Sequence, residues 1–519
     1  MIEQDLMERI ADAYGCAVDP GMYERIRHWE DWWRGDVDGF HTYLENAAFG
    51  HPVRRKMYGM RMAKKVCEDW AALLLNDRTY VRLGDTAAED WIGKVFRDGD
   101  FWRRSNYLVE KTFAAGTGAC LLRVDGIDRT EWLEERKRQN ALPAQEPDAA
   151  QLQEDDDREG TALLRELLPD GEKAYGGKIN GGRGHGWRVH GRRIHGWSDH
   201  GHPVRIWFDF VDASQIVPIS VEGGRITEAA FVSRITLRGK DYDYLEVHLR
   251  QEDGYTIHNR YFCRENGKLT EVHLPDMPAR EIRTGCPYPF FAILTPNIQN
   301  TADGAGGMGQ SIYGDALDCL RGVDLAFNNF CRDLRLGGKK VFINQSLIQR
   351  DNAGNLYTPD DVAQQLFMTI GDSDLADNPL IEEHNPSLRT GENRDAVQCQ
   401  LDYLSFRCGL GTRHYLFSGV QGKAHLTATQ YTGERQDMRQ NCAKHSQNVT
   451  AYLCSIIRPM LWLAMEMLGK GFCVSDIRIF HDDSYFIDAE SERARDLREV
   501  EAGLMEPEQF RRRWYDADR

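Results

Sequence analysis

Residues 311–336 read SIYGDALDCLRGVDLAFNNFCRDLRL, and this stretch decides how the chain is organised. Its apolar residues recur every three or four positions, which is the period of one helix face. The stretch therefore predicts a helix from Ser311 to Leu336, about 39 Å long at 1.5 Å per residue, that ends at Gly337-Gly338. The apolar stripe comprises Ile312, Ala316, Leu320, Val323, Phe327, Phe330 and Leu334.

Two more long helices, a small mixed segment, a strand and a terminal helix are predicted after this helix. Pro459 lies inside the longer of the two helices and should kink it, because proline cannot donate the backbone hydrogen bond. The elements expected are, in order, the mixed segment Lys339–Arg389 with the strand candidate Val341–Asn344, a helix at Glu392–Cys408, a loop at Gly409–Leu426, a very long helix at Thr427–Leu468, a strand at Ile477–Phe480 and a charged terminal helix.

The chain before this region combines helical and strand patterns. Residues 1–80 are predicted as helices, among them Tyr58–Asn76, and a further helix covers Trp102–Ala115. The apolar run Ala119–Val124 follows two glycines and predicts a strand. Short β-type runs then continue from residue 205 to about residue 295. Helices and strands that occur in separate runs indicate an α+β fold.

Residues 134–203 differ abruptly from the rest in composition. An acidic, polar stretch is followed by glycine-rich sequence and the tandem pentapeptides HGWRV, HGRRI, HGWSD and HGHPV at 185–204. The segment is interpreted as an insertion, disordered in its first half and forming a mobile surface loop. A metal site at the histidines is the alternative, although a spacing of five residues places successive side chains on opposite faces of a strand. The histidines are His185, His190, His195 and His200.

Charge and cysteine usage restrict the classes of function. The net charge of −16 argues against a protein that coats DNA, since phosphate binding needs Lys and Arg. An acidic surface suits a protein that DNA slides past without sticking. The alternative is that the charge only keeps the protein in solution. The cysteines form no CxxC pair, which favours a reducing compartment. The N-terminus is not typical of a signal peptide. The most apolar window, Ala451–Leu468, is not typical of a membrane span. An intracellular protein is therefore expected.

Sequence motifs for catalysis are largely missing. There is no Walker A sequence, no HExxH and no GxSxG. Gly304–Gly309 matches the GxGxxG pattern ahead of a helix and offers the alternative of a nucleotide-binding enzyme. That site requires a βαβ unit that the sequence does not predict, so a flexible glycine hinge is the preferred interpretation. The pair Asp482-Asp483 is interpreted as a solvated turn. We expect no enzymatic activity, no cofactor and no metal.

Basic side chains occur at two places next to the long helices. Lys339 and Lys340 follow the first helix, and the loop Gly409–Leu426 contains four more. On a monomer these residues are unremarkable, but repeated around a symmetric ring they would form two rings of positive charge that meet a phosphate backbone without reading its sequence. The four in the loop are Arg413, His414, Lys423 and His425.

Short motifs along nearly the whole chain resemble those of portal proteins from long-tailed phages of Gram-positive bacteria. Their order and spacing carry the resemblance, and residues 134–203 depart from it. The motifs are Trp29-x-x-Trp32-Trp33-Arg34-Gly35, Arg61–Asn76, Ile216–Ile219 with Ile226–Val232, Pro287-x-Pro289-Phe290-x-x-Ile293-x-x-Pro296-Asn297-Ile298, Gly309–Asp318 with Leu325–Phe327, Thr427–Gln430, Asp482–Ser484 and Ala502–Leu504.

The resemblance implies a dodecameric ring at one capsid vertex of the virion, assembled in the host cytoplasm, through which double-stranded DNA is packaged, retained and ejected. It implies the terminase large subunit, a head–tail adaptor, and the scaffolding and major capsid proteins as partners, and no membrane. Its regions would be a wing at 1–133 and 204–303 around the 134–203 insertion, stem helices at 304–336 and 392–408, a clip at 337–391, a tunnel loop at 409–426, a kinked wing helix at 427–470 and a C-terminal wing and crown at 471–519.

Residues 134 to about 184 are predicted to be dispensable for assembly. Their composition cannot bury enough apolar surface to offset the entropy of ordering, and long surface insertions cost little stability. A deletion that joins Trp132 to Arg205 through a short Gly-Ser linker should therefore still form rings in negative-stain electron micrographs. Insoluble or monomeric deletion protein would show that the segment is structural.

Overall fold

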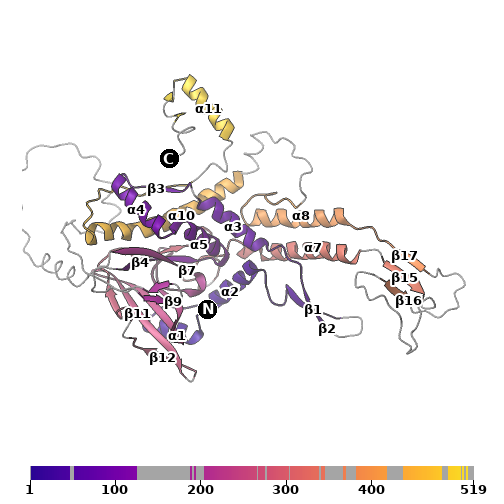
Figure 1. Ribbon diagram of the computed structural model, residues 1–519, viewed down its shortest axis with the longest axis horizontal. Helices are drawn as coiled ribbons and strands as arrows, with labels where there is room; N and C mark the ends of the chain where they lie inside the picture. Colours follow the sequence, from indigo (N-terminus) through magenta and orange to yellow (C-terminus); the bar gives the residue numbers. More distant parts are fainter. Residues whose placement is uncertain are drawn as a thin grey trace, which may run out of the picture. The chain divides into compact units, whose positions relative to one another are not determined.

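The computed structural model describes residues 2–46, 52–76, 78–125, 187–189, 192–194, 204–265, 267–274, 277–302, 304–337, 340–344, 366–369, 381–417, 436–481, 489–503, 505–507 and 510–511. The chain is a mixed α+β protein with several antiparallel sheets, as predicted (Figure 1). It divides into two compact units. The larger unit is Met1–Asp31, Lys64–Gly314 and Ala428–Arg519, and the smaller unit is Trp32–Ala63 and Asp315–Thr427.

The N-terminal helices confirm the helical period of the sequence. In the helix predicted at Tyr58–Asn76, the apolar residues that recur at helical spacing are buried; these are Met62, Val66, Trp70, Leu73 and Leu74. Asp85 caps α4 by accepting hydrogen bonds from the backbone amides of the first helical turn. The helices are α1 at Gln4–Tyr14, α2 at Pro20–Arg34, α3 at Met62–Leu74, α4 at Thr86–Asp98 and α5 at Phe101–Ala115.

The prediction that residues 1–80 are helices is wrong in part. Strands β1, Thr42–Asn46, and β2, Pro52–Lys56, form an antiparallel hairpin between α2 and α3. Gly35 and Gly39 adopt left-handed φ angles of 69° and 74°, which end the helical path, and a proline begins the second strand. In addition β3, Tyr80–Arg82, pairs with the C-terminal strand β18, Arg478–Phe480.

A six-stranded antiparallel sheet forms much of the larger unit, as the strand-rich sequence predicted. Its order is β12-β11-β10-β9-β8, with β13 paired to β11. Both faces of the sheet are buried near its centre, since residues 244–248 of β10 are buried in succession. Tyr244 and Val247, which lie on opposite faces of the strand, are therefore both in the core. The strands are β8 at Ile216–Glu222, β9 at Arg225–Leu237, β10 at Lys240–Gln251, β11 at Gly254–Glu265, β12 at Lys268–Val272 and β13 at Glu281–Arg283.

A three-stranded sheet fixes the place of the insertion. Strand β4, Gly118–Asp125, lies between β14, Phe291–Leu294, and β7, Arg205–Asp212. Asp125 is paired with Arg205 in the antiparallel register. The chain therefore leaves the sheet and returns to it at one hairpin end. Within the segment two pentapeptides form the antiparallel strands β5, Trp187–Val189, and β6, Arg192–Ile194; its other residues lie outside the described ranges.

The helix predicted from Ser311 begins only at Leu317, so the predicted start is wrong. The backbone amide of Ile312 donates to the carbonyl of Phe113 at the end of α5, 2.9 Å away. Gly309 packs so closely on Gly116 that a Cβ on either residue would overlap the carbonyl oxygen of the other. These contacts hold the chain extended until a short 3-10 turn, Gly314–Ala316, leads into α7 at Leu317–Leu336. Gly309, at the end of the glycine-rich segment, is thus a packed contact; the flexible hinge expected for the segment stays a prediction.

Helix α10, Gln436–Trp462, packs on strand β14 and α5 in the larger unit. Its buried face includes Tyr452, whose hydroxyl lies 3.0 Å from that of Ser105. The α-helix passes Pro459 and gives way to a π-helical turn, Leu463–Met467, so it ends before the predicted Leu468. The predicted start at Thr427 lies outside the described residues, and the expected kink at Pro459 stays a prediction. Helix α11, Ala489–Glu501, is the charged terminal helix.

His445 on α10 is held by the loop after β14. The backbone amide of Asn297 donates to His445 Nδ1 at 3.0 Å, and the Asn297 side chain donates to the Lys444 carbonyl at 2.6 Å. The imidazole also makes edge-to-face contacts with Trp70 and Phe113. Burial, assisted by the nearby Lys444 charge, lowers the pKa of His445 to about 3.

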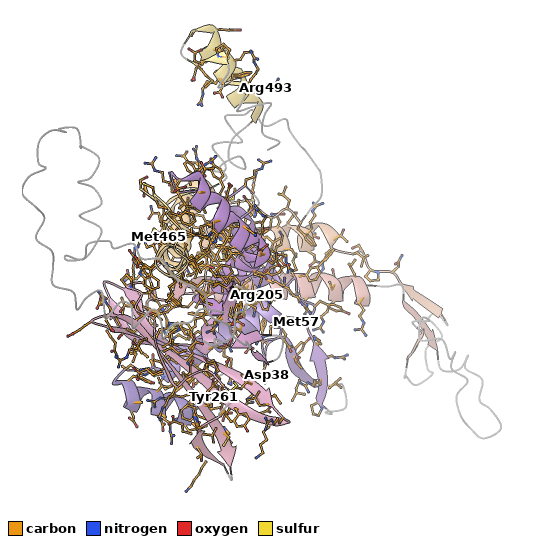
Figure 2. All side chains as sticks on the ribbon, turned by 60° about the vertical axis from the view of Figure 1, so that its left-hand side comes forward. Asp38, Met57, Arg205, Tyr261, Met465 and Arg493 are labelled. Atoms are coloured by element: carbon orange, nitrogen blue, oxygen red, sulfur yellow. The ribbon has the colours of Figure 1, made fainter. Side chains whose placement is uncertain are left out.

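The smaller unit contains the hairpin β1–β2, the helices α7 and α8 and a three-stranded sheet. The strand predicted at Val341–Asn344 is β15, Lys340–Asn344. It lies in the middle of the small sheet. Its parallel neighbour is β16, Leu366–Thr369, and its antiparallel neighbour is β17, Ile381–His384. Helix α8 spans Thr390–Arg407, close to its predicted bounds. Figure 2 labels Asp38 and Met57 on the two sides of the base of the hairpin.

The stability of the larger unit is predicted to fall in acid because of His445. The unfolded imidazole has an ordinary pKa near 6.5, whereas the folded one is lowered to about 3. Between these values the unfolded chain binds the extra proton, so stability is lost as the pH falls through this window. From pH 7 to pH 5 the loss should be about 2 kcal/mol. Urea unfolding at the two pH values measures it, and His445→Gln should remove this part of the pH dependence. An unchanged dependence in the variant would contradict the assignment.

Candidate functional site

Helices α7 and α8 pack side by side in opposite directions. Asp333, near the end of α7, accepts hydrogen bonds from Arg389 and Asn393 at the beginning of α8. At the other end, the Arg407 guanidinium donates to the Asp315 carbonyl at 2.9 Å. The α7 stripe is buried at its first turns, half-buried in the middle and exposed at Leu334, with 44% of that residue accessible. Contacts among the described residues therefore cover only part of it.

Helix α8 carries apolar side chains on two opposite faces in its later turns. One face, with Val397, Leu401, Leu404 and Cys408, is buried. The face of α8 on the opposite side of the helix is exposed. On it, 60% of Tyr403 and 57% of Phe406 are accessible. An exposed strip of this kind is typical of a surface that another protein covers. The exposed face consists of Glu392, Asp395, Ala396, Cys399, Tyr403 and Phe406.

The loop after α8 is anchored for the length that the structure describes. Gly409 and Gly411 adopt φ angles of 78° and 79°, which turn the chain back from the helix end. The side-chain amide of Gln398 donates to the Tyr415 carbonyl at 2.8 Å and accepts from the Phe417 amide at 2.9 Å. The Phe417 ring packs edge-on against aromatic side chains of α7. Up to Phe417 the glycines therefore form part of a turn that these contacts hold in place.

Arg413 and His414 lie in this anchored turn. Arg413 is exposed and has a φ of 60°, a left-handed value that costs a residue with a Cβ about 1 kcal/mol. His414 is half-buried beside the Tyr415 ring. The predicted partners Lys423 and His425 lie outside the described residues, as does Lys339. Lys340 is the first residue of β15, and its side chain is not described.

His41 and Asp324 form a pair of the type used in general-base catalysis, but neither is available for it. His41 Nε2 donates to Asp324 Oδ2 at 3.0 Å, since His41 Nδ1 already accepts a hydrogen bond from the Val37 amide at 2.9 Å. Asp324 also accepts from the Met60 amide at 2.7 Å, and both side chains are buried. With both ring nitrogens engaged, the pair anchors the chain around the hairpin to α7.

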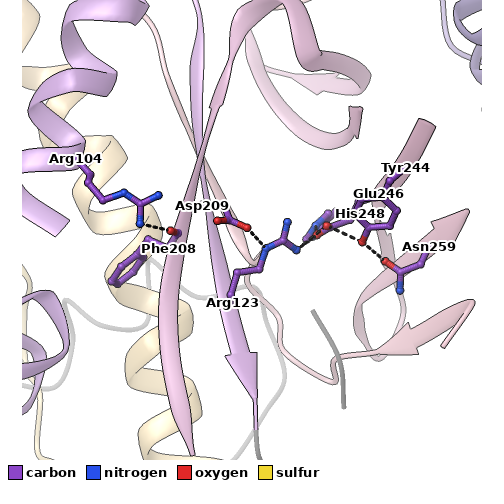
Figure 3. Close-up of polar contacts among 8 residues, drawn as sticks. All are labelled: Arg104, Arg123, Phe208, Asp209, Tyr244, Glu246, His248 and Asn259. Carbon is purple, nitrogen blue, oxygen red and sulfur yellow. Dashed lines mark hydrogen bonds and ion pairs between the residues drawn. The ribbon is translucent and has the colours of Figure 1, made fainter. Parts of the chain in front are cut away.

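A buried charged cluster in the larger unit joins its two sheets (Figure 3). Arg123 on β4 donates to Asp209 on β7 at 3.0 Å and to both carboxylate oxygens of Glu246 on β10 at 2.6 Å. His248 lies 2.8 Å from Glu246. Burial alone would raise the pKa of Glu246, but the Arg123 charge and His248 outweigh it and hold that pKa well below its usual range. The cluster is inaccessible to a substrate and has a structural role.

The glycine pattern at 304–309 lacks the setting of a dinucleotide site. Gly304, Gly306 and Gly307 adopt left-handed φ angles, but the helix that follows begins only at Leu317. Strand β14, which precedes the loop, pairs antiparallel with β4, whereas a dinucleotide site needs a parallel βαβ unit whose helix begins at the pyrophosphate. Nothing in the described part of this segment presents a helix N-terminus to a phosphate.

The described residues contain neither a metal-binding cluster nor a membrane-spanning helix. Within these ranges no three His, Cys, Asp or Glu side chains gather in a way that could hold a metal ion. The pentapeptide histidines and Asp482-Asp483 fall outside the ranges. No helix in the described ranges is both long and apolar enough to cross a membrane.

Comparison with known proteins finds no family model that matches the chain and no curated protein that matches it.

Sequence reasoning missed the exposed face of α8 and the hairpin β1–β2. The face was detectable, because Cys399, Tyr403 and Phe406 repeat at helical spacing half a turn away from Val397 and Leu401. Apolar residues on a second face of a helix are a signal that this face is also covered. The hairpin was hidden because its strands are short and largely polar.

Proposed function

We propose that the chain is the portal subunit of a tailed phage or prophage and forms the ring through which the genome enters and leaves the capsid. The observation that supports this best is the second apolar face of α8, with Tyr403 and Phe406 exposed. A closed cyclic oligomer covers such a face in every copy, because the same contact repeats until the ring closes.

The order of elements in the smaller unit fits the same proposal. Two long antiparallel helices, α7 and α8, flank a small mixed sheet, β15 to β17. In the proposed ring the helices are the stem, the small sheet is the clip, and residues 409–426 are the tunnel loop. The larger unit, with its sheets and α10, supplies the wing. This assignment agrees with the order of motifs on which the resemblance to portal proteins rests.

The charges of the chain suit a passage for DNA better than a tight DNA-binding surface. The net charge of −16 disfavours a close wrap of DNA. Arg413 is exposed at the turn after α8, so a ring repeats this charge at one height of the channel. Contacts of this type meet phosphates alone and have no sequence preference. The resemblance adds the terminase large subunit, the head–tail adaptor, and the scaffolding and major capsid proteins as partners.

A nucleotide-binding enzyme that uses Gly304–Gly309 is the alternative function, and the packed geometry of that loop does not favour it. Binding of ATP or NAD to the purified chain would support it.

The first test is the oligomeric state. The purified protein should form rings with a central hole in negative-stain electron micrographs. Tyr403→Ser and Phe406→Ser should each raise the concentration at which rings dissociate about ten-fold, since truncation of a central aromatic costs more than about 1 kcal/mol. Tyr107→Ser, at an exposed tyrosine of α5, is the matched control and should change nothing. A monodisperse wild-type monomer at micromolar concentration, with no rings in any preparation, would rule out the proposal.

The second test concerns the tunnel loop. Arg413→Glu combined with Lys423→Glu should leave rings intact and reduce the DNA packaged or retained, because the reversed charges repel phosphate. Lys94→Glu with Arg97→Glu, at exposed positions of α4, makes the same charge change and should leave DNA content unaltered. DNA content of particles assembled at moderate salt is the measurement. Normal filling by the loop variant would show that the loop does not grip DNA.

A further inference from the structure

The hairpin β1–β2 has a fixed base and an exposed surface. At the base the Met57 amide donates to the His41 carbonyl at 2.7 Å, and the buried His41–Asp324 pair lies next to it. Beyond the base every residue of β2 is exposed, and Leu44 on β1 is 71% accessible. A two-stranded hairpin is only marginally stable alone in water. A rigid base that presents an exposed apolar side chain suggests an arm that is covered by something else.

The two faces of the hairpin differ. The Tyr43 hydroxyl lies 3.4 Å from Arg332 on α7, so the Tyr43 face is turned toward that helix. Side chains alternate along a strand, which places Leu44 on the opposite face. Its cross-strand neighbours there are basic, because Leu44 pairs with Arg54, and Lys56 follows two residues along β2. On the outer face Leu44 is therefore flanked by two cations.

The exposed face of α8 has the complementary character. Its first turns carry Glu392 and Asp395, of which Asp395 has Arg394 as a neighbour at 3.4 Å. Further along, the same face is apolar at Cys399 and Tyr403. Carboxylates followed by apolar side chains on α8 match cations beside a leucine on the hairpin, in both charge and hydrophobic character.

These complementary surfaces lie on opposite sides of α7, so one chain does not bring them together. The hairpin and the chain beside it contact α7 at Asp324, Asn328 and Arg332, whereas α8 contacts it at Gly322 and Asp333. At about 100° per residue, Asn328 and Asp333 are about 140° apart around the helix. Figure 1 shows α8 and the hairpin on either side of α7.

We infer that the β1–β2 hairpin of each subunit docks on the exposed face of α8 of the next subunit. The contact joins two different surfaces head to tail, and such a contact generates a ring when the rotation closes. It covers Leu44 and Tyr403 at the same time and neutralises Arg54 and Lys56 with the α8 carboxylates. The inference rests on the proposed ring and names the partner of the α8 face as a second copy of this chain.

Disulfide trapping tests the contact directly. Leu44→Cys should form a disulfide with Cys399 of a neighbouring copy under mild oxidation, giving a ladder of linked subunits on a non-reducing gel. The added Cys399→Ser change should abolish the ladder, and Val53→Cys, on the other face of the hairpin, should not produce it. A disulfide between the introduced thiol and Cys399 of the same chain keeps the monomer size and would overturn the inference.

Charge reversal provides a second measurement. Arg54→Glu with Lys56→Glu should raise the concentration at which rings dissociate at least ten-fold, and adding Glu392→Lys with Asp395→Lys should restore the wild-type value. In one outcome the wild-type chain forms rings, while the Leu44→Cys variant gives no ladder and charge reversal leaves the dissociation concentration unchanged. In that case the hairpin contact is wrong and the proposed ring is retained. If the wild-type chain forms no ring in any preparation, the proposed function fails and this inference fails with it.

Discussion

The packing of one apolar face of helix α8 on α7 is the contact on which the organisation of the smaller unit depends, and it leaves apolar side chains on the opposite face uncovered. One face packs on α7, with Val397, Leu401 and Leu404 at its centre. The loop that returns through Phe417 closes over part of the same pair. Tyr403 and Phe406 remain exposed because no element among the described residues of the unit packs over them. A neighbouring copy is the covering element that the proposed ring supplies.

The larger unit is held in a different way, by buried polar contacts that specify its geometry. Arg123 joins β4, β7 and β10 through Asp209 and Glu246, all of which are buried. A buried ion pair of this kind contributes little net free energy, but breaking one partner leaves the other charge uncompensated. The register of β4 and β7 is therefore strongly specified, and their far end can accept an insertion without losing it.

In the proposed ring, the balance of charge would let one surface both meet and release DNA. The net charge of −16 disfavours close phosphate binding, and an exposed cation such as Arg413 acts only at short range because salt screens it. Symmetry multiplies each such cation around the proposed ring. Contacts that are few, identical and independent of base sequence hold a moving duplex without fixing it at one position.

The sequence by itself determined the elements whose period is long and regular. Helix α3 was predictable because burial of one face imposes a helical repeat on its apolar residues. The strands β7 to β10 were predictable as short apolar runs between turn residues, and helix α8 was predicted close to its bounds. The place of the insertion followed from an abrupt change in composition. The position of Arg413 in a loop after α8 followed from the same pattern. Local sequence preference was sufficient to place these elements along the chain.

Only the tertiary structure decided the features that depend on distant residues. The start of α7 moved from Ser311 to Leu317 because Ile312 bonds to Phe113, and Gly309 became a packing contact because Gly116 lies against it. His41 and Asp324 are far apart in the sequence, and no local pattern announces that they meet. The exposure of Tyr403 was likewise undecided until α7 occupied the opposite face of α8. Which side of an apolar helix stays open is set by what packs on it, and that is a property of the fold rather than of the segment.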